Sequence, residues 1–355
     1  MRLLLAFWLF LTSLATAGQR IYPVASMPVS KLVVFDVQRV NDYAERCLVA
    51  SAQGIYNSRP LAKDLVYLVW SQEDAFWLDW LKKNRGIQTR QLANMAQLIA
   101  LGSRDCVVYD EHPGHLPNIA TMISGVNRWL MAGDPELVHR FHLKVRADLS
   151  GRFQTNAAAY DWVWTKYGHS FSRQCASFTV PYRTPTHNPA QLRDYLVANK
   201  VFTFWTSGSL DSMISGGNRE AEERKVGTIL REGFPLCTPV LGYPWSGDGY
   251  GPGEGDGLTF LSWLGKFLVP TDNFSNLSVW STFPVSLKKL QTSAPEEVVF
   301  DANKTYASLV MSDGDNLCTF ENYWPNYWRE LGKVDFPVGW TMGPTLRELA
   351  PPIYE

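Results

Sequence analysis

The sequence predicts an α/β protein built from several domains. Three short runs of apolar, often β-branched residues occur in the first third of the chain, and each fits a buried strand. Segments of about 10 to 15 residues with helical spacing of apolar side chains separate these runs. Strands that alternate with helices imply βαβ units and a mostly parallel sheet. The 355 residues are enough for two or more domains at about 100–200 residues each.

The expected elements of the first part carry local start signals. Asn41 and Asp42 are suitable caps for a helix that turns Tyr43 and Cys47 inward, and Ser71 is a suitable cap for the next helix. Cys47 fits a small core residue. The expected strands are "KLVVFDV" (31–37), "DLVYLVW" (64–70) and "CVVYD" (106–110).

The later part of the chain shows further boundaries. A Pro-rich stretch at 180–189 looks like a linker, a helix leading into a strand is expected over 191–205, and the Gly-rich stretch at 242–257 is expected to form a long loop. A strand-like segment, "KTYASLVM", opens the last unit. The expected units are a leader at 1–17, three N-terminal units at 18–104, 105–187 and 188–297, and a C-terminal unit at 298–355.

The N-terminus is typical of a secretory signal peptide. Arg2 supplies the positive charge, and residues 3–14 form the apolar core. Ala15-Thr16-Ala17 fits the small-residue pattern of a cleavage site. We therefore expect cleavage after Ala17 and a secreted protein. No later segment is long and apolar enough for a membrane anchor.

Composition limits the partners and the cysteine chemistry. The net charge of −1 argues against nucleic acid, which requires a basic patch. The five cysteines include no C-x-x-C pair, which excludes a zinc knuckle or a thioredoxin-like motif, and they are compatible with one or two disulfides. Three N-x-S/T sequons suit an exported protein, and we expect their asparagines on the surface, at Asn273, Asn276 and Asn303.

The stretch "YASLVMSDGDN" (306–316) carries the main candidate site. An apolar strand runs into Asp313 and Asp315, and Asn316 follows as a candidate for substrate binding. An EF-hand is excluded because the later ligand positions are not oxygen donors. Two carboxylates at the carboxyl end of a strand suit catalysis, since that edge binds ligands in α/β sheets. The alternative is a turn in which the aspartates accept backbone N–H bonds.

The Gly-rich stretch offers a second set of candidates. It contains no G-x-G-x-x-G and no G-K-[ST], so it does not predict phosphate binding. Glu254 and Asp256 lie near Trp245 and Tyr250, and aromatic faces with carboxylates suit a sugar substrate. The alternative is a plain surface loop in which the glycines supply turns.

The histidines do not predict a metal site or a cofactor. They form two pairs, one around a Pro-Gly turn and one at i,i+3 spacing on an expected helix, and no H-E-x-x-H is present. Solvated or locally hydrogen-bonded rings explain both pairs, which are His112/His115 and His139/His142.

Several stretches together carry a resemblance to a known family. The most specific are "SDGDN" and "GEGDG"; softer matches include "VFDVQRVNDYAERCLVASAQGIYNSRP", "LRDYLVANKVFTFW" and "VGWTMGPTLRELAP". Taken together, they resemble the GxGYxYP family of glycoside hydrolase-like proteins. The resemblance implies small βαβ-type N-terminal domains followed by the beginning of a (β/α)-barrel-like hydrolase domain. The motif that names the family is not found before Glu355, and "GDGYGPG" only partly resembles it. We therefore expect a fragment or a short isoform.

These observations favour a secreted carbohydrate-processing protein. Asp313 and Asp315 are the catalytic candidates, and no metal or cofactor is assigned. Two alternatives remain open at this point. One is a metal-dependent carbohydrate deacetylase or hydrolase, and the other is a non-catalytic glycan-binding protein that uses its tryptophans and the Gly-rich stretch.

Overall fold

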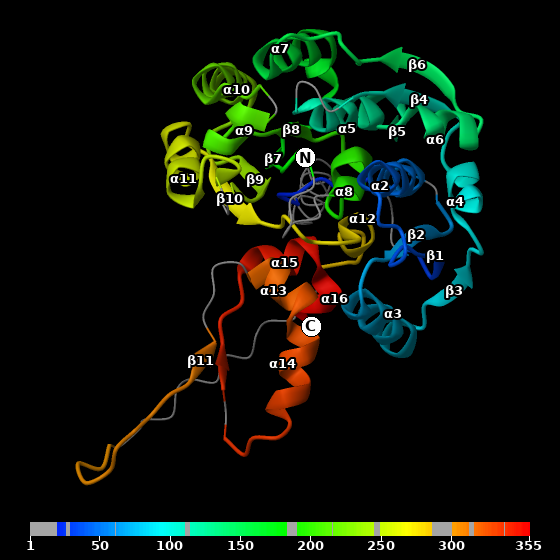
Figure 1. Ribbon diagram of the computed structural model, residues 1–355. Helices are drawn as coiled ribbons and strands as arrows, with labels where there is room; N and C mark the ends of the chain where they lie inside the picture. Colours follow the sequence, from blue (N-terminus) through cyan, green and yellow to red (C-terminus); the bar gives the residue numbers. More distant parts are fainter. Residues whose placement is uncertain are drawn as a thin grey trace, which may run out of the picture.

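The computed structural model describes residues 20–25, 29–60, 62–110, 114–182, 190–214, 216–244, 249–285, 300–311, 316–336 and 338–355. In this part of the chain the strands form four sheets, all with parallel pairing, that follow one another along the sequence (Figure 1). The predicted multi-domain α/β class is therefore confirmed. No helix among these residues is long and apolar enough to cross a membrane.

The first sheet has the strand order β2-β1-β3 and confirms two of the predicted strands. Asp42 caps α2 by accepting a hydrogen bond from the Glu45 backbone N–H at 2.8 Å, as expected. Ser71 caps α3 reciprocally with Asp74. The elements are β1 (Lys31–Asp36), α2 (Tyr43–Asn57), β2 (Leu65–Val69), α3 (Gln72–Arg85), β3 (Gln88–Gln91) and α4 (Met95–Leu101).

The second sheet has the order β5-β4-β6, with the predicted third strand at its centre. Helix α6 ends at Arg140, and His142 lies beyond it with a φ of 50°. The expectation that His139 and His142 share one helix was therefore wrong. The elements are β4 (Asp105–Val108), α5 (Leu116–Asn127), β5 (Leu130–Ala132), α6 (Pro135–Arg140), β6 (Lys144–Asp148), α7 (Asn156–Tyr167) and η1 (Gly168–Ser170).

The third sheet has the order β10-β9-β7-β8. Strand β7 precedes the boundary expected at residue 188, yet it pairs with β8 and β9. The elements are β7 (Ala176–Phe178), α8 (Arg193–Ala198), β8 (Phe202–Phe204), α9 (Ser209–Ile214), α10 (Arg219–Gly233), β9 (Pro239–Gly242), α11 (Glu254–Trp263), β10 (Phe267–Pro270) and α12 (Leu277–Trp280).

The Gly-rich stretch is not a loop over its whole length, which corrects the prediction. Helix α11 begins at Glu254, after Gly253 with a φ of 91°. Glycine is needed inside this helix, because a Cβ at Gly257 would lie 2.3 Å from a side-chain atom of Pro244. A glycine that the sequence pattern places in a turn therefore lies in a helix, where the absence of a side chain permits close packing.

Helices α2, α5 and α8 meet near the middle of the molecule (Figure 1). A Cβ at Gly54 of α2 would lie 2.5 Å from the carbonyl oxygen of Asp194 in α8. Gly125 of α5 approaches α8 in the same way, 2.8 Å from the carbonyl oxygen of Val197. An ordinary side chain at either glycine would push the helices apart. The first three sheets thus share a helical centre, in which Cys47 is buried as predicted.

The fourth sheet pairs two short parallel strands joined by helices, which is a βαβ unit. Figure 1 shows it at the bottom of the molecule, where residues 300–309 form an extended segment that points away from the other sheets. Its elements are β11 (Val310–Met311), α13 (Asn316–Asn322), α14 (Trp324–Leu331), β12 (Gly339–Trp340), α15 (Pro344–Leu349) and α16 (Pro351–Tyr354).

Candidate functional site

The predicted catalytic pair, Asp313 and Asp315, lies outside the described residues. The elements on either side are β11, which ends at Met311, and α13, which begins at Asn316. The backbone N–H of Thr341 donates to the Met311 carbonyl oxygen at 3.0 Å, so the chain after β12 stays beside the end of β11. The segments that follow both strands therefore start at the same edge, which is where open α/β sheets bind ligands.

An aromatic groove of about 400 Å³ reaches this edge. Trp340, the last residue of β12, packs edge-on against Trp324 of α14 with ring centroids 3.9 Å apart. Trp328 of α14 is 59% exposed. The aromatic groove thus presents flat apolar surfaces near the carboxyl end of β12. Its main lining residues are Phe76, Trp80, Trp324, Trp328, Trp340 and Met342.

Two buried carboxyl groups anchor α13 to the other units. The hydroxyl group of Ser275, after β10, lies within hydrogen-bond distance of both Asp74 in α3 and Glu321 in α13. All three residues are buried. In addition, the indole N–H of Trp77 donates to the Glu321 carbonyl oxygen at 2.8 Å. The helix that follows the predicted catalytic pair is therefore fixed against the first and third units.

This arrangement requires a bound proton. The Ser275 hydroxyl group has one hydrogen and can donate it to only one of the two carboxyl groups. Asp74 accepts two backbone N–H bonds at the start of α3, at 3.0 and 3.1 Å, and one from Asn276 Nδ2 at 3.0 Å, all of which favour its anion. Burial, together with the charge of Asp74, raises the pKa of Glu321 well above its usual range. Glu321 is therefore the protonated partner.

Asn276 is a buried polar centre and not a surface sequon, which corrects the prediction. Its Oδ1 accepts hydrogen bonds from the Leu68 backbone N–H and from Gln53 Nε2, both at 2.8 Å, and its Nδ2 donates to the Leu68 carbonyl oxygen at 2.8 Å. A glycan on this amide would break these bonds and has no room. Asn273 is partly buried, and Asn303 is exposed as expected.

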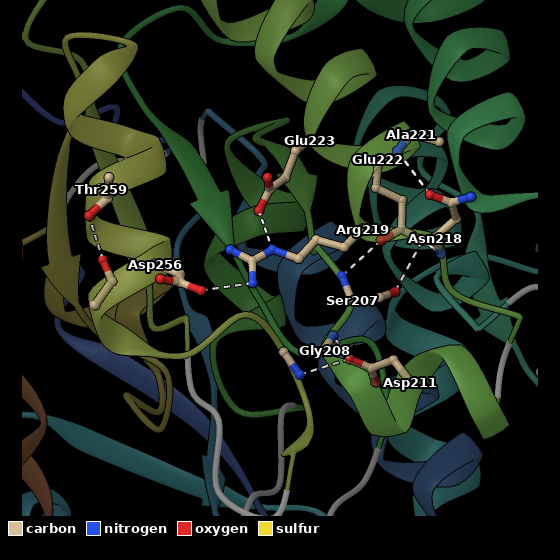
Figure 2. A network of polar contacts seen from close by, with 12 residues as sticks. Ser207, Gly208, Asp211, Asn218, Arg219, Ala221, Glu222, Glu223, Asp256 and Thr259 are labelled. Carbon is tan, nitrogen blue, oxygen red and sulfur yellow. Dashed lines mark hydrogen bonds and ion pairs between the residues drawn. The ribbon is translucent and has the colours of Figure 1, made fainter.

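The carboxyl end of the third sheet carries a second polar network (Figure 2). Glu222 of α10 accepts hydrogen bonds from the backbone N–H and the hydroxyl group of Ser207, which follows β8, at 2.8 and 3.0 Å. Asn156 Nδ2 and the Asn218 backbone N–H donate to the same carboxylate, at 2.8 and 3.0 Å. Glu222 thereby ties α10 to the end of β8 and to α7.

Asp211 links two backbone segments at the same edge of the third sheet. Its Oδ2 accepts the backbone N–H groups of Gly208 and Gly251, at 2.5 and 2.7 Å, so it joins the β8–α9 connection to the Gly-rich stretch (Figure 2). Burial raises the pKa of Asp211 to about 6. The backbone approach is close, because a Cβ at Gly208 would lie 2.1 Å from the Gly251 carbonyl oxygen. Asp211 therefore serves to hold the Gly-rich stretch in place.

His115 lies beside Ser207 but does not form a catalytic triad with it. Its Nε2 is 3.3 Å from Ser207 Oγ and its Nδ1 is 3.1 Å from the hydroxyl group of Tyr160. The three residues are completely buried, so no substrate reaches them. Burial lowers the pKa of His115 to about 4, which keeps the ring neutral at pH 7. The local hydrogen bonding expected for this histidine is confirmed.

The other predicted sugar-site residues lie on or near α11. Asp256, in its first turn, forms an ion pair with Arg219 of α10 at 2.9 Å, and Glu254, the first residue of the helix, is exposed. The ring of Tyr250 lies 5.5 Å from that of Tyr182. Trp245 lies outside the described residues. The structure thus places these residues at the third sheet, whereas the predicted catalytic pair follows β11 of the fourth.

Metal-binding groups and disulfides are absent from the described residues. No cluster of three or more histidine, cysteine, aspartate or glutamate side chains in this part of the chain could hold a metal ion. His112 is not described, and His139 and His142 are exposed. All five cysteines are unpaired, so the disulfides considered from the sequence are not formed.

Sequence reasoning missed the polar residues that organise both sheet edges. Asp74 had a usable signal, because it stands three residues after the cap Ser71. Ser275, Glu321 and Glu222 had none, since each makes its contacts with distant parts of the chain.

The fold therefore defines a multi-domain α/β protein whose last described unit contains a two-stranded parallel sheet. Comparison with family models agrees with this class. Four models match consecutive parts of the chain: "GxGYxYP_N 1st domain" (31–103), "GxGYxYP_N second domain" (104–171), "GxGYxYP third domain" (177–282) and "GxGYxYP putative glycoside hydrolase C-terminal domain" (303–355). The chain belongs to the GxGYxYP family.

A solved structure has the same fold. It is titled as a putative hydrolase from Bacteroides thetaiotaomicron VPI-5482, and it matches with a TM-score of 0.75 at 20% sequence identity. The match covers 96% of this chain and 62% of that one. The chain therefore spans about three fifths of the length of this structure. No curated protein matches the chain.

Proposed function

We propose that the protein is an exported carbohydrate-processing hydrolase that cleaves glycosidic bonds with the carboxyl groups of Asp313 and Asp315. The observation that supports this proposal is that β11 ends immediately before "SDGDN" and α13 begins at its last residue. The segment connects the carboxyl end of β11 to α13, and β12 ends at the same edge. In α/β folds catalytic residues gather at that edge because several connections meet there.

The chemistry requires two carboxyl groups with different roles. One donates a proton to the leaving oxygen, and the other either attacks the anomeric carbon or activates a water molecule. A separation of about 5–5.5 Å gives retention and about 6.5–9.5 Å gives inversion. Asp313 and Asp315 are separated only by Gly314, which permits the backbone to turn between them. Mutual repulsion would raise the pKa of one carboxyl group, as a general acid requires.

Two further observations support a glycan as substrate. The C-terminal family model is described as "GxGYxYP putative glycoside hydrolase C-terminal domain", and it matches residues 303–355. The aromatic groove reaches the same sheet edge through Trp340 and Met342. Aromatic faces pack well against the apolar face of a pyranose ring. Export rests on the leader pattern that ends at Ala17.

The test is hydrolysis of a panel of purified oligosaccharides by the intact protein in ¹⁸O-labelled water. The proposal predicts shorter oligosaccharides with the label on the new reducing end, detected by mass spectrometry. Release of acetate from acetylated sugars without chain shortening would contradict it and would favour the deacetylase alternative. Failure to shorten any member of a broad panel would also count against it.

A further inference from the structure

A second surface of the protein combines an exposed tryptophan with a groove. Trp263, the last residue of α11, is 85% exposed, more than any other large apolar side chain in the described part of the chain. It lines a groove of about 350 Å³ between α10 and α11, together with Phe260 and Leu264. We call this the α10–α11 groove. Its volume is at the lower end of the range for small-ligand sites.

The floor and walls of the α10–α11 groove differ in character. Gly227 of α10 forms part of the floor, and the ring of Phe260 would lie 3.5 Å from a Cβ at this position, so the missing side chain adds depth. The wall on α10 carries two carboxylates, from Glu220 and Glu223, and two guanidinium groups, from Arg224 and Arg231. The net charge of this wall is therefore zero.

An ion-pair clamp links the two helices. Arg219 donates to Glu223 of the same helix at 2.7 Å and to Asp256 in the first turn of α11 at 2.9 Å (Figure 2). The clamp lies at the end of the helices opposite to Trp263, since Asp256 starts α11 and Trp263 ends it. It also orients the Glu223 carboxylate, which lines the groove. Asp256 is therefore a positioning residue for this surface.

The chemistry of the α10–α11 groove selects a neutral glycan. A flat exposed indole matches the apolar face of a pyranose ring. Carboxylates and guanidinium groups side by side supply hydrogen-bond acceptors and donors for hydroxyl groups. The balanced wall offers no net attraction to a strongly charged ligand such as a nucleic acid or an acidic peptide.

We propose that the α10–α11 groove is a binding site for a segment of a neutral glycan chain, separate from the predicted catalytic pair. It would hold a polymeric substrate on the third sheet while cleavage takes place at the fourth. This inference rests on the proposed function for the identity of the ligand class, but not for the existence of the site.

The test is affinity gel electrophoresis of the intact protein in gels containing a neutral β-glucan, α-glucan or mannan. At least one polysaccharide is expected to retard the protein, and Trp263→Ala should weaken its affinity at least tenfold. Trp263→Phe, which keeps an aromatic face, should recover most of the affinity. Asp256→Asn should weaken binding severalfold by loosening the clamp. Phe300→Ala is the matched control, since Phe300 is an exposed aromatic (69%) outside the groove, and it should bind as the wild type does.

Hydrolysis of short soluble oligosaccharides is measured on the same variants. Loss of polysaccharide binding with unchanged turnover of short substrates supports the site, and it does so whether or not the predicted catalytic pair is correct. Unchanged retardation of Trp263→Ala, or equal loss in Phe300→Ala, would overturn the proposal. A change in oligomeric state on Trp263→Ala, measured by light scattering, would also overturn it, because the surface would then bind a second copy of the chain.

Discussion

Replacing Glu321 with glutamine should remove much of the pH dependence of stability. In the wild type, Glu321 keeps a proton in the folded state, and burial together with the charge of Asp74 raises its pKa. A raised pKa in the folded state contributes stability that is complete below the unfolded value, about 4.3, and is lost as the pH rises through the folded value. A glutamine amide can donate to Ser275 Oγ as the protonated carboxyl group does, and it does not titrate.

The magnitude follows from linkage. While the folded state binds one proton more than the unfolded state, the free energy of unfolding falls by about 1.4 kcal/mol per pH unit. The wild type should therefore lose stability more steeply than the variant as the pH rises, by at most about 1.4 kcal/mol per pH unit, over the range in which Glu321 keeps its proton. Asp194, whose pKa burial raises to about 7, contributes in the same direction in both proteins. Burial also raises the pKa of Asp74 to about 6, and Asp74 shares the Ser275 hydroxyl group with Glu321, so the difference in slope between wild type and variant reports on this pair.

Urea unfolding at pH 6, 7 and 8, followed by tryptophan fluorescence, measures this difference. The variant should match the wild type within about 1 kcal/mol at pH 6 and should exceed it at pH 8. Asp79→Asn on the exposed face of α3 is the control and should keep the wild-type slope. An equal slope in Glu321→Gln and wild type would refute the assignment of the proton.

Three other predictions follow from particular residues. Gly208→Ala should destabilise the third unit by about 3 kcal/mol in urea unfolding, because its Cβ would meet the Gly251 carbonyl oxygen. Gly255→Ala in α11 is the control and should not destabilise the protein, because a Cβ there has open space. Equal stability of the two variants would contradict the close approach at Gly208. In a host that glycosylates, peptide mass spectrometry should find sugar on Asn303 and none on Asn276; an occupied Asn276 would show that its buried hydrogen bonds do not form. Protein recovered from the medium should begin within a residue or two of Gly18, and an intact Met1 would rule out cleavage of the leader.

The first part of the fold was predictable because its signals are local. Apolar runs fixed the positions of β1, β2 and β4, and the caps Asp42 and Ser71 lie next to the helices that they start. The start of α11 was missed for a physical reason. Its glycines look like turn residues in the sequence, but Gly257 is required by close packing against Pro244, which no local pattern reveals.

The polar centres depend on contacts between distant residues. Asn276 reads as a sequon, yet its amide bonds to Leu68, more than two hundred positions earlier in the chain. Glu321 gave no signal at all, because Asp74, whose charge raises its pKa, lies in helix α3 of a distant part of the chain. The aspartates of "SDGDN", in contrast, were assigned from their place after an expected strand, "KTYASLVM". Only Val310–Met311 of that segment forms a strand, and helix α13, which follows, was not predicted. Their catalytic role stays a prediction.

The most direct test of that role uses Asp313→Asn and Asp315→Asn, made separately in the intact protein. Asp335→Asn is the exposed control. Glycan turnover and melting temperature are measured on all three variants. Each of the first two variants should lose at least a hundredfold in turnover, within the range typical of general acid–base groups, while the melting temperature stays within a degree or two and the control is fully active. If both variants melt several degrees lower and lose activity only in proportion to the folded fraction, the aspartates form a structural turn and are not catalytic.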